Sequence, residues 1–308
     1  MIYFTIVEVS IVILIIGTVI FMFLFTLNLI DDYKCRKSIV LNSHTFYRAF
    51  SKIKSKKKRK AIYAVYDFCR YADDLVDEYK DEARLNKLEK DLVKHKSGFY
   101  VHSYRFRSLK RHTYHLYDAN DYQAFFDMIK GQKMDLHNRT YETLDDLLDY
   151  SYHVAGTVGL MLVPILAYKE KKELRAFAIN LGYAMQITNI LRDVGEDFKQ
   201  GRVYLPKEMI KSANYSLQDL EKGIINEAFI KLFESLASIA EKYFDQALND
   251  INLFPLDSRK PLAYAIILYR AILDACRSSD YDVFSKKNFV SDKQKMQIIK
   301  TYEKESLT

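Results

Sequence analysis

The sequence predicts an all-α protein, a single large helical bundle preceded by an N-terminal transmembrane helix. Apolar residues recur at spacings of three and four through most of the 308 residues, and no segment alternates convincingly with period two. Glycine (9) and proline (4) are scarce, which favours long helices with few tight turns. The third observation is an uncharged run over residues 9–30, close to the start of the chain.

This run, "VSIVILIIGTVIFMFLFTLNLI", predicts a helix that spans a membrane. At about 1.5 Å per residue it is roughly 33 Å long, against a hydrocarbon core of roughly 30 Å. A signal peptide would have a basic start and a shorter apolar core, whereas the only early charge here is Glu8. We therefore expect an uncleaved single-pass helix over 1–30 and a separate body over 31–308, with a falsely assigned start codon as the alternative.

Basic residues follow the run and predict its orientation in the cell membrane. Lys34, Arg36 and Lys37 come directly after it, so the positive-inside bias places the body on the cytoplasmic side. Further on, "SKIKSKKKRK" (51–60) carries basic residues and no acid, and it accounts for the formal net charge of +7. Such a loop favours anionic membrane lipid by about 1 kcal/mol per residue near the surface. Attraction of diphosphate substrates or simple solvation are the alternatives; without interleaved aromatics, nucleic acid is not an expected partner.

The body is predicted to be one helical domain with a buried centre. The spacing predicts helices near 33–50, 58–79, 82–95, 118–136, 141–168, 171–199, 225–253, 258–279 and 291–304, with breaks at "KSG" (96–98), "GRVYLP" (201–206) and "LFPLD" (253–257). The stretch 263–276 is apolar nearly all round, as expected in the middle of a large bundle. Three widely spaced cysteines predict no zinc site and fit a reducing compartment.

Two predicted helices each carry a line of polar groups within an apolar sequence. In 186–198 the line is Gln186, Asn189, Asp193 and Asp197, spaced three, four and four, so that these side chains share one helix face. A solvated stripe would explain one such line. A second line, however, runs through "YAVYDFCRYADDLVDE" (63–78), in the order Tyr66, Arg70, Asp73 and Asp77, with Asp74 beside it.

Carboxylates four residues apart in a buried helix repel each other unless a cation neutralises them. Mg²⁺ fits this requirement, because it binds one or two carboxylates and completes its coordination with water and substrate phosphate. Two facing pairs therefore predict a metal-bridged diphosphate site. Departure of diphosphate from an allylic carbon leaves a carbocation, which aromatic faces in a dry pocket can stabilise; the chain has 24 Tyr and 19 Phe. A di-iron site is not expected, because the facing helices lack Glu-x-x-His.

The chain also closely resembles the squalene/phytoene synthase family of head-to-head prenyl diphosphate synthases. The resemblance covers roughly residues 33–304 and rests on ordered motifs: "SHTFYRAF" (43–50), "YAVYDFCRYADDLVDE" (63–78), "GQKMDL" (131–136), "YSYHVAGTVG" (150–159), "QITNILRDVGEDFKQGRVYLP" (186–206) and "LYRAILD" (268–274). It is strongest to the bacterial dehydrosqualene (diapophytoene) synthase branch. It implies an isoprenoid synthase bundle over 31–308 with a central catalytic cavity.

Site residues are implied by this resemblance, position by position. It implies catalytic roles for Asp73, Asp77, Asp193, Asp197 and Tyr204. It implies a cluster of two or three Mg²⁺ ions, with no nucleotide cofactor, held by Asp73, Asp74, Asp77, Asn189, Asp193, Glu196 and Asp197. It implies substrate contacts from Ser43, Phe46, Tyr66, Arg70, Tyr150, Gln186, Asn189, Arg192 and Tyr269. Lys293 and Lys295 stand where a more arginine-rich segment is expected, which puts their role as phosphate ligands in doubt.

The implied reaction is condensation of two farnesyl diphosphates to dehydrosqualene through a cyclopropyl diphosphate, the first step of C30 carotenoid synthesis. A carotenoid desaturase that consumes the product is an expected partner. Two enzymatic alternatives stay open, phytoene synthesis from geranylgeranyl diphosphate and squalene synthesis with NADPH. An alternative of another class is an inactive membrane-bound scaffold, which the two intact acidic motifs disfavour.

Overall fold

A computed structural model describes residues 2–137 and 139–305, and within these ranges it contains helices and no β-strand. The all-α prediction is confirmed. The helices are α1 (Ile2–Asn42), α2 (His44–Phe50), α3 (Lys56–Asp77), α4 (Glu82–Lys96), α5 (Tyr104–Thr113), α6 (Gln123–Leu136), α7 (Leu144–Ser151), the π-helical turn η1 (Tyr152–Gly156), α8 (Thr157–Leu166), α9 (Arg175–Lys199), α10 (Lys207–Ser212), α11 (Leu217–Glu221), α12 (Glu227–Asn249), the 3-10 turn η2 (Asp250–Leu253), α13 (Leu256–Arg277) and α14 (Asp292–Glu305).

Helix α1 is longer than the predicted membrane helix, and it passes residue 30 without a break. The prediction of a separate helix over 33–50 is wrong, because α1 continues to Asn42 and α2 begins only at His44. The carboxylates of Asp31 and Asp32 do not stop α1, since both find partners in the body. The buried Asp31 carboxylate accepts two hydrogen bonds from Arg107, at 2.9 and 2.7 Å, and Asp32 accepts one from Arg111 at 2.9 Å.

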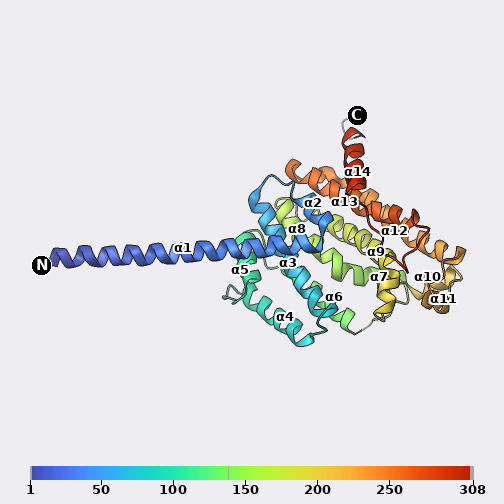
Figure 1. Cartoon of the computed structure of the whole chain (residues 1–308), viewed down its shortest axis with the longest axis horizontal. Coiled ribbons are helices and arrows are strands. Elements are labelled where there is room, and N and C mark those ends of the chain that lie inside the picture. Colours follow the sequence, from blue (N-terminus) through green and yellow to red (C-terminus); the bar gives the residue numbers. More distant parts are fainter. Residues whose placement is uncertain (1, 138, 306–308) are drawn as a thin grey trace.

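The apolar part of α1 lies outside the body (Figure 1). Its large side chains are exposed, from Val9 at 57% to Ile30 at 45%. Within the described residues it is the one helix long and apolar enough to cross a membrane. After the exposed side chains of residues 9–30, α1 buries Asp31, Cys35 and Ile39 against the body. The division into an anchor over 1–30 and a catalytic domain over 31–308 stays a prediction.

The other helices follow the sequence prediction with three kinds of difference. The segment predicted as one helix over 141–168 is α7, η1 and α8, and the helix predicted from 118 starts at Gln123. Three shorter helices, α5, α10 and α11, were not predicted; α5 and α10 have too few turns to show a clear apolar period, and α11 is a single turn. The predicted break at 96–98 is confirmed, and Gly98 adopts a φ of +83°, a conformation that glycine takes most readily.

Helix α9 lies in the middle of the bundle and packs against α8, η1, α12 and α13 (Figure 1). The approach of η1 is close enough to require glycine. A methyl group added at Gly182 would lie 2.4 Å from the backbone of Gly156, and one added at Gly159 would lie 2.7 Å from the carbonyl oxygen of Ala178. The "AGTVG" segment (155–159) therefore serves close helix packing.

Candidate active site

A central cavity of about 340 Å³ lies between α2, α3, α6, α8, α9 and α13. It has two chemically different ends. Carboxylates, amides and arginines line one end: Arg70, Asp73, Asp77, Gln132, Asp135, Gln186, Asn189, Asp193, Asp197 and Arg202. Apolar groups line the remainder: Phe46, Phe50, Val158, Leu162, Val163, Leu166, Phe177, Leu181, Phe254, Leu262 and Ala265. This is a pocket for an amphipathic molecule with an anionic head and a hydrocarbon tail.

The two acidic lines meet at this cavity. Asp73 and Asp77 reach it from the last turns of α3, and Asp193 and Asp197 reach it from the last turns of α9. Their i, i+4 spacing puts each pair on one helix face, so two helices more than a hundred residues apart each present two carboxylates to the same space. The facing arrangement expected from the spacing is therefore present.

Burial and the charge of a neighbouring carboxylate raise the pKa of one aspartate in each pair. Burial raises the pKa of Asp73 to about 7, and the nearby charge of Asp77 adds to this. Burial likewise raises the pKa of Asp197 to about 8, with Asp193 as the second cause. Unpaired buried carboxylates are costly, and a polyvalent cation between the two helices would relieve that cost.

Basic residues at the edge of the cavity neutralise part of this charge. Arg202, in the turn after α9, donates a hydrogen bond to Asp77 on α3 at 2.8 Å and so connects the two acidic motifs. Arg192 pairs with its neighbour Asp193 through two nitrogens, and the Lys287 ammonium lies 3.5 Å from the same carboxylate. Arg202 was not among the predicted site residues. Its place in "GRVYLP", directly after the second acidic motif, could have indicated it.

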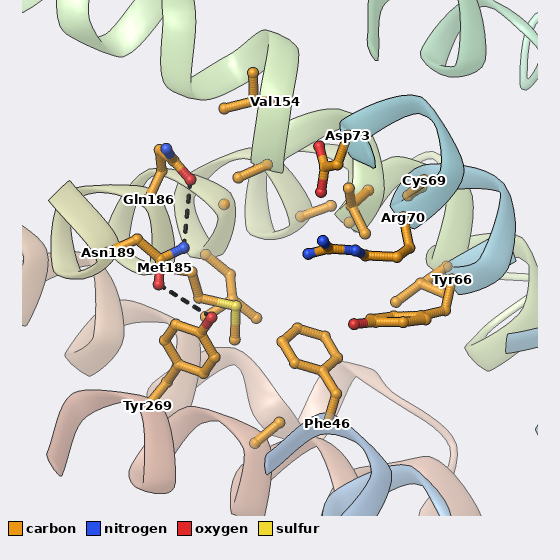
Figure 2. A pocket seen from close by; sticks show the side chains of 18 of the residues that line it. Phe46, Tyr66, Cys69, Arg70, Asp73, Val154, Met185, Gln186, Asn189 and Tyr269 are labelled. Carbon is orange, nitrogen blue, oxygen red and sulfur yellow. Dashed lines mark hydrogen bonds between the residues drawn. The ribbon is translucent and has the colours of Figure 1, made fainter. Parts of the chain in front are cut away.

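Figure 2 shows part of the predicted substrate-contacting set around the cavity, namely Phe46, Tyr66, Arg70, Gln186, Asn189 and Tyr269. The guanidinium of Arg70 points into the space between Asp73 and the rings of Tyr66 and Phe46. Its Nε has no hydrogen-bond partner although it is buried, which leaves a donor for an anionic ligand.

On the facing side, the side chains of α9 and α13 hold one another in place. The Tyr269 hydroxyl donates to Asn189 Oδ1 at 3.2 Å, and the Asn189 amide donates to Gln186 Oε1 at 3.4 Å (Figure 2). The ring of Tyr269 meets the ring of Phe46 edge to face, with centroids 5.8 Å apart. These residues therefore form a continuous wall of aromatic and amide groups beside the acidic end.

Asp135, on α6, is a further carboxylate that the prediction missed. It accepts hydrogen bonds from the hydroxyls of Tyr150 at 2.9 Å and Tyr204 at 2.8 Å, whose rings are stacked 5.0 Å apart. Burial raises the pKa of Asp135 to about 6. One turn earlier, Gln132 donates to Asp73 Oδ1 at 2.6 Å. The three-residue spacing of these two polar groups in "GQKMDL" was a usable signal.

Four predicted site residues lie outside the cavity wall. Ser43 accepts a hydrogen bond from the backbone of Phe46 at 3.4 Å as the N-cap of α2, and Asp74 pairs with Arg70 at 2.5 Å. Arg192 and Glu196 line a separate pocket beside the cavity, where Lys287 bonds Glu196 at 2.8 Å. Their predicted roles in binding metal or substrate stay predictions.

The donor set at the acidic end fits Mg²⁺. Its donors are carboxylate and amide oxygens, which is the chemistry of a hard cation. The cysteine on the cavity wall, Cys69, is buried and directs its thiol to Met161 Sδ. In the described part of the chain, no three carboxylate, histidine or cysteine side chains are close enough to hold one ion by themselves. Mg²⁺ does not need three, because water and phosphate oxygens complete its octahedron.

Replacing Asp135 by leucine is expected to lower product formation at least tenfold, because the hydroxyls of Tyr150 and Tyr204 lose their shared acceptor beside the acidic end. Asp127→Leu is the matched control, since Asp127 accepts a 2.7 Å bond from Tyr152 outside the cavity wall. Activity assays paired with circular dichroism check this. Equal losses in both folded variants would show that Asp135 only stabilises the fold.

The fold and the site together define an α-helical protein with a cavity for an amphipathic molecule that has an anionic head and a hydrocarbon tail. Comparison with known proteins gives its family. Residues 40–294 match the model of the family described as squalene/phytoene synthase, so the chain belongs to the squalene/phytoene synthase family. A solved dehydrosqualene synthase in complex with ligand superposes with a TM-score of 0.84 at 37% identity, covering 92% of this chain and 98% of its own.

Two characterised relatives of similar identity differ in their products. The 4,4'-diapophytoene synthase of Staphylococcus haemolyticus is 34% identical over 89% of this chain and 97% of its own length. The 15-cis-phytoene synthase of Synechococcus elongatus is 36% identical over 85% of this chain and 89% of its own length. The family and the reaction class are thus clear, and identity alone does not choose between the two products.

Proposed function

We propose that the protein condenses two farnesyl diphosphates head to head, through presqualene diphosphate, to dehydrosqualene. The observation that carries the proposal is the single cavity with two facing aspartate pairs at one end and an apolar, ring-lined wall at the other. The likeness to the diapophytoene and dehydrosqualene synthases supports farnesyl diphosphate as the substrate.

Each end of the cavity would have a distinct task. Asp73, Asp77, Asp193 and Asp197 would hold Mg²⁺, which neutralises the diphosphate and makes it a leaving group. Arg70, with its unpaired Nε, would bind a diphosphate oxygen and keep the head at this end. The rings of Tyr66, Phe46 and Tyr269 would face the allylic carbons and exclude water while positive charge develops there.

Stoichiometry separates this proposal from its alternatives. Full-length protein with farnesyl diphosphate and Mg²⁺ is expected to release two diphosphates for each C30 hydrocarbon, without NADPH. If the protein makes phytoene and accepts only geranylgeranyl diphosphate, the result would support the phytoene synthase alternative. If it requires NADPH, the result would support the squalene synthase alternative. Binding of substrate without diphosphate release would support the scaffold alternative.

Mg²⁺ is expected to stabilise the protein more at pH 8.5 than at pH 6. The pKa values of Asp73 and Asp197, raised to about 7 and 8, exceed the roughly 3.9 of an unfolded aspartate, so above pH 4 the folded metal-free protein keeps protons that the unfolded chain has released. Stability without metal therefore falls as pH rises towards 8. Between pH 6 and pH 8.5 we expect the Tm of the metal-free protein to drop by roughly 3–6 °C, and we expect Mg²⁺ to restore it.

Scanning calorimetry of the metal-free protein and of the Mg²⁺-loaded protein measures this. Asp197→Asn is the informative variant, because its neutral amide no longer repels Asp193. It should raise the metal-free Tm at pH 8.5 and reduce the Mg²⁺ shift. A shift that is the same at both pH values, or unchanged in Asp197→Asn, would contradict Mg²⁺ binding at these carboxylates.

We also propose that α1 anchors the protein in the cell membrane, with the body on the cytoplasmic side. Its exposed apolar side chains need a non-aqueous surrounding, and the basic groups that follow favour this orientation. Full-length protein should stay with membranes after alkaline carbonate extraction. Deletion of residues 1–30 keeps Asp31 and Asp32, which connect α1 to α5, and should give soluble, active protein. Full-length protein in the soluble fraction would contradict the anchor.

A further inference from the structure

The end of the apolar run on α1 is fixed against one particular side of the body. Arg111 on α5 donates to the backbone oxygen of Asn28 at 3.3 Å and to Asp32 at 2.9 Å. Lys60, in the first turns of α3, pairs with Asp32 at 2.8 Å. The start of α3 and the end of α5 therefore lie level with the point where α1 enters the body (Figure 1). A membrane that contains residues 9–30 would have its surface at this side.

The basic segment 51–60 lies on this side, and its charges divide into two groups. Lys58 bonds Asp257 at 3.0 Å, Arg59 bonds the Lys54 backbone at 3.0 Å, and Lys60 bonds Asp32, so these three hold the fold together. The others are exposed, and no acidic side chain in the described ranges pairs with them: Lys52, Lys54, Lys56 and Lys57. These free cations are not needed for folding and are available to an anionic partner.

A groove of about 560 Å³ opens beside these lysines, between the start of α3, the segment after α5 and the end of α8. Lys57, Lys169 and His115 line its polar part, together with Ser55, His112, Glu170 and the already paired Lys58. Its apolar part consists of Leu116, Pro164, Ile165, Leu166, Tyr168 and Pro255. The groove thus offers cations next to apolar side chains, on the side where the membrane surface would lie if α1 spans a bilayer.

We propose that this groove binds one anionic glycerophospholipid of the membrane that holds α1, with the lipid phosphate at Lys57 and Lys169 and an acyl chain along Pro164 and Ile165. The proposal rests on the anchoring role of α1. Charge selects the lipid, because a zwitterionic headgroup would bring its own cation towards the lysines. A lysine near an anionic surface contributes about fivefold in affinity, so removing two should weaken the preference roughly twentyfold.

The absence of tryptophan from the chain provides a clean reporter of occupancy. Tyr168, which is 54% exposed in the groove, is replaced in full-length protein by Tyr168→Trp, giving a single indole. The protein is reconstituted in phosphatidylcholine vesicles that contain either phosphatidylglycerol or phosphatidylcholine with brominated acyl chains, at equal mole fraction. Brominated phosphatidylglycerol is expected to quench the indole at a mole fraction at least tenfold lower than brominated phosphatidylcholine does.

Lys57→Gln with Lys169→Gln should remove this preference. The matched control is Lys211→Gln with Lys222→Gln, two exposed lysines near α10 and α11, on the side away from α1 (Figure 1). Equal quenching by both lipids, no quenching in vesicles that carry the protein, or a preference unchanged by Lys57→Gln with Lys169→Gln would overturn the proposal.

Flotation of the vesicles and hydrocarbon synthesis are measured in the same samples. Protein that does not float refutes the anchor and the groove together, whereas floating protein without hydrocarbon product contradicts the proposed reaction alone.

Discussion

Asp193→Ala is expected to reduce diphosphate release by at least a thousandfold, which corresponds to a barrier increase of about 4 kcal/mol. The carboxylate of Asp193 lines the cavity and faces the pair on α3. Without it, Arg192 loses its partner, Lys287 keeps only its bond to Glu196, and a cation at the acidic end would lose a ligand from α9. Asp73→Ala should have the same effect from α3, because a metal that bridges the two helices needs both. The readout is enzymatic detection of diphosphate, with helical circular dichroism as the folding control.

Glu196→Ala is the matched comparison, since Glu196 lies one turn from Asp193 but outside the cavity wall, bonded to Lys287. The loss of activity in this variant decides whether Asp193, Glu196 and Asp197 bind metal as a unit. A loss as large as that of Asp193→Ala would mean that Glu196 turns inward when the metal binds. Retention of more than about a tenth of wild-type activity by Asp193→Ala or Asp73→Ala would show that the residue is not a metal ligand.

The second large effect is expected at the apolar end, where Phe50→Ala should allow geranylgeranyl diphosphate to enter. Phe50 is 1% exposed and lines the cavity, and its ring lies 5.5 Å from that of Phe46. Burying five more carbons is favourable by a few kcal/mol at about 0.8 kcal/mol per CH₂, so only a steric barrier can exclude the longer chain. Removing the ring should therefore yield some phytoene. Phe46→Ala should act in the same way, although its position near Arg70 and Tyr269 predicts a larger loss of activity.

The same change costs about 3–5 kcal/mol of stability, which could mask a change in selectivity. Phe50→Leu keeps part of the volume and serves as a milder variant. Phe233→Leu is the control, because Phe233 is fully buried in the core and does not line the cavity. Product profile and Tm are measured together. Destabilised Phe50 variants that still accept only the C15 substrate would refute the steric limit at this position.

The sequence was most informative where side-chain spacing determines geometry. The acidic lines at 73–77 and 193–197 could be predicted because i, i+4 spacing fixes the face on which the carboxylates lie, and the tertiary fold only has to bring two such faces together. The resemblance supplied Tyr150 and Tyr204 but not the reason that they stack. That reason is Asp135, which meets them from a different helix, α6.

The sequence was less informative where long-range pairing overrides a local signal. Asp31 and Asp32 were expected to follow the end of the apolar helix. Helix α1 nevertheless continues to Asn42, because Arg107 and Arg111, some 80 residues later, donate hydrogen bonds to both carboxylates. Similarly, Arg202 follows a glycine turn and gives no periodic signal, and its bond to Asp77 exists only in the folded bundle. The resemblance also implied metal contacts from Asp74 and Glu196, but both lie off the two polar lines and pair with Arg70 and Lys287 instead.

Competition between farnesyl and geranylgeranyl diphosphate in a single reaction tests most directly whether the protein synthesises dehydrosqualene. Full-length protein in phospholipid vesicles receives equal concentrations of farnesyl and geranylgeranyl diphosphate with Mg²⁺ and without NADPH, and the hydrocarbons are identified by mass spectrometry. We predict dehydrosqualene as the main product and two diphosphates released for each hydrocarbon. Chelation of Mg²⁺ should abolish both hydrocarbon formation and diphosphate release. Phytoene as the main product, or no hydrocarbon while both substrates remain intact, would contradict this prediction.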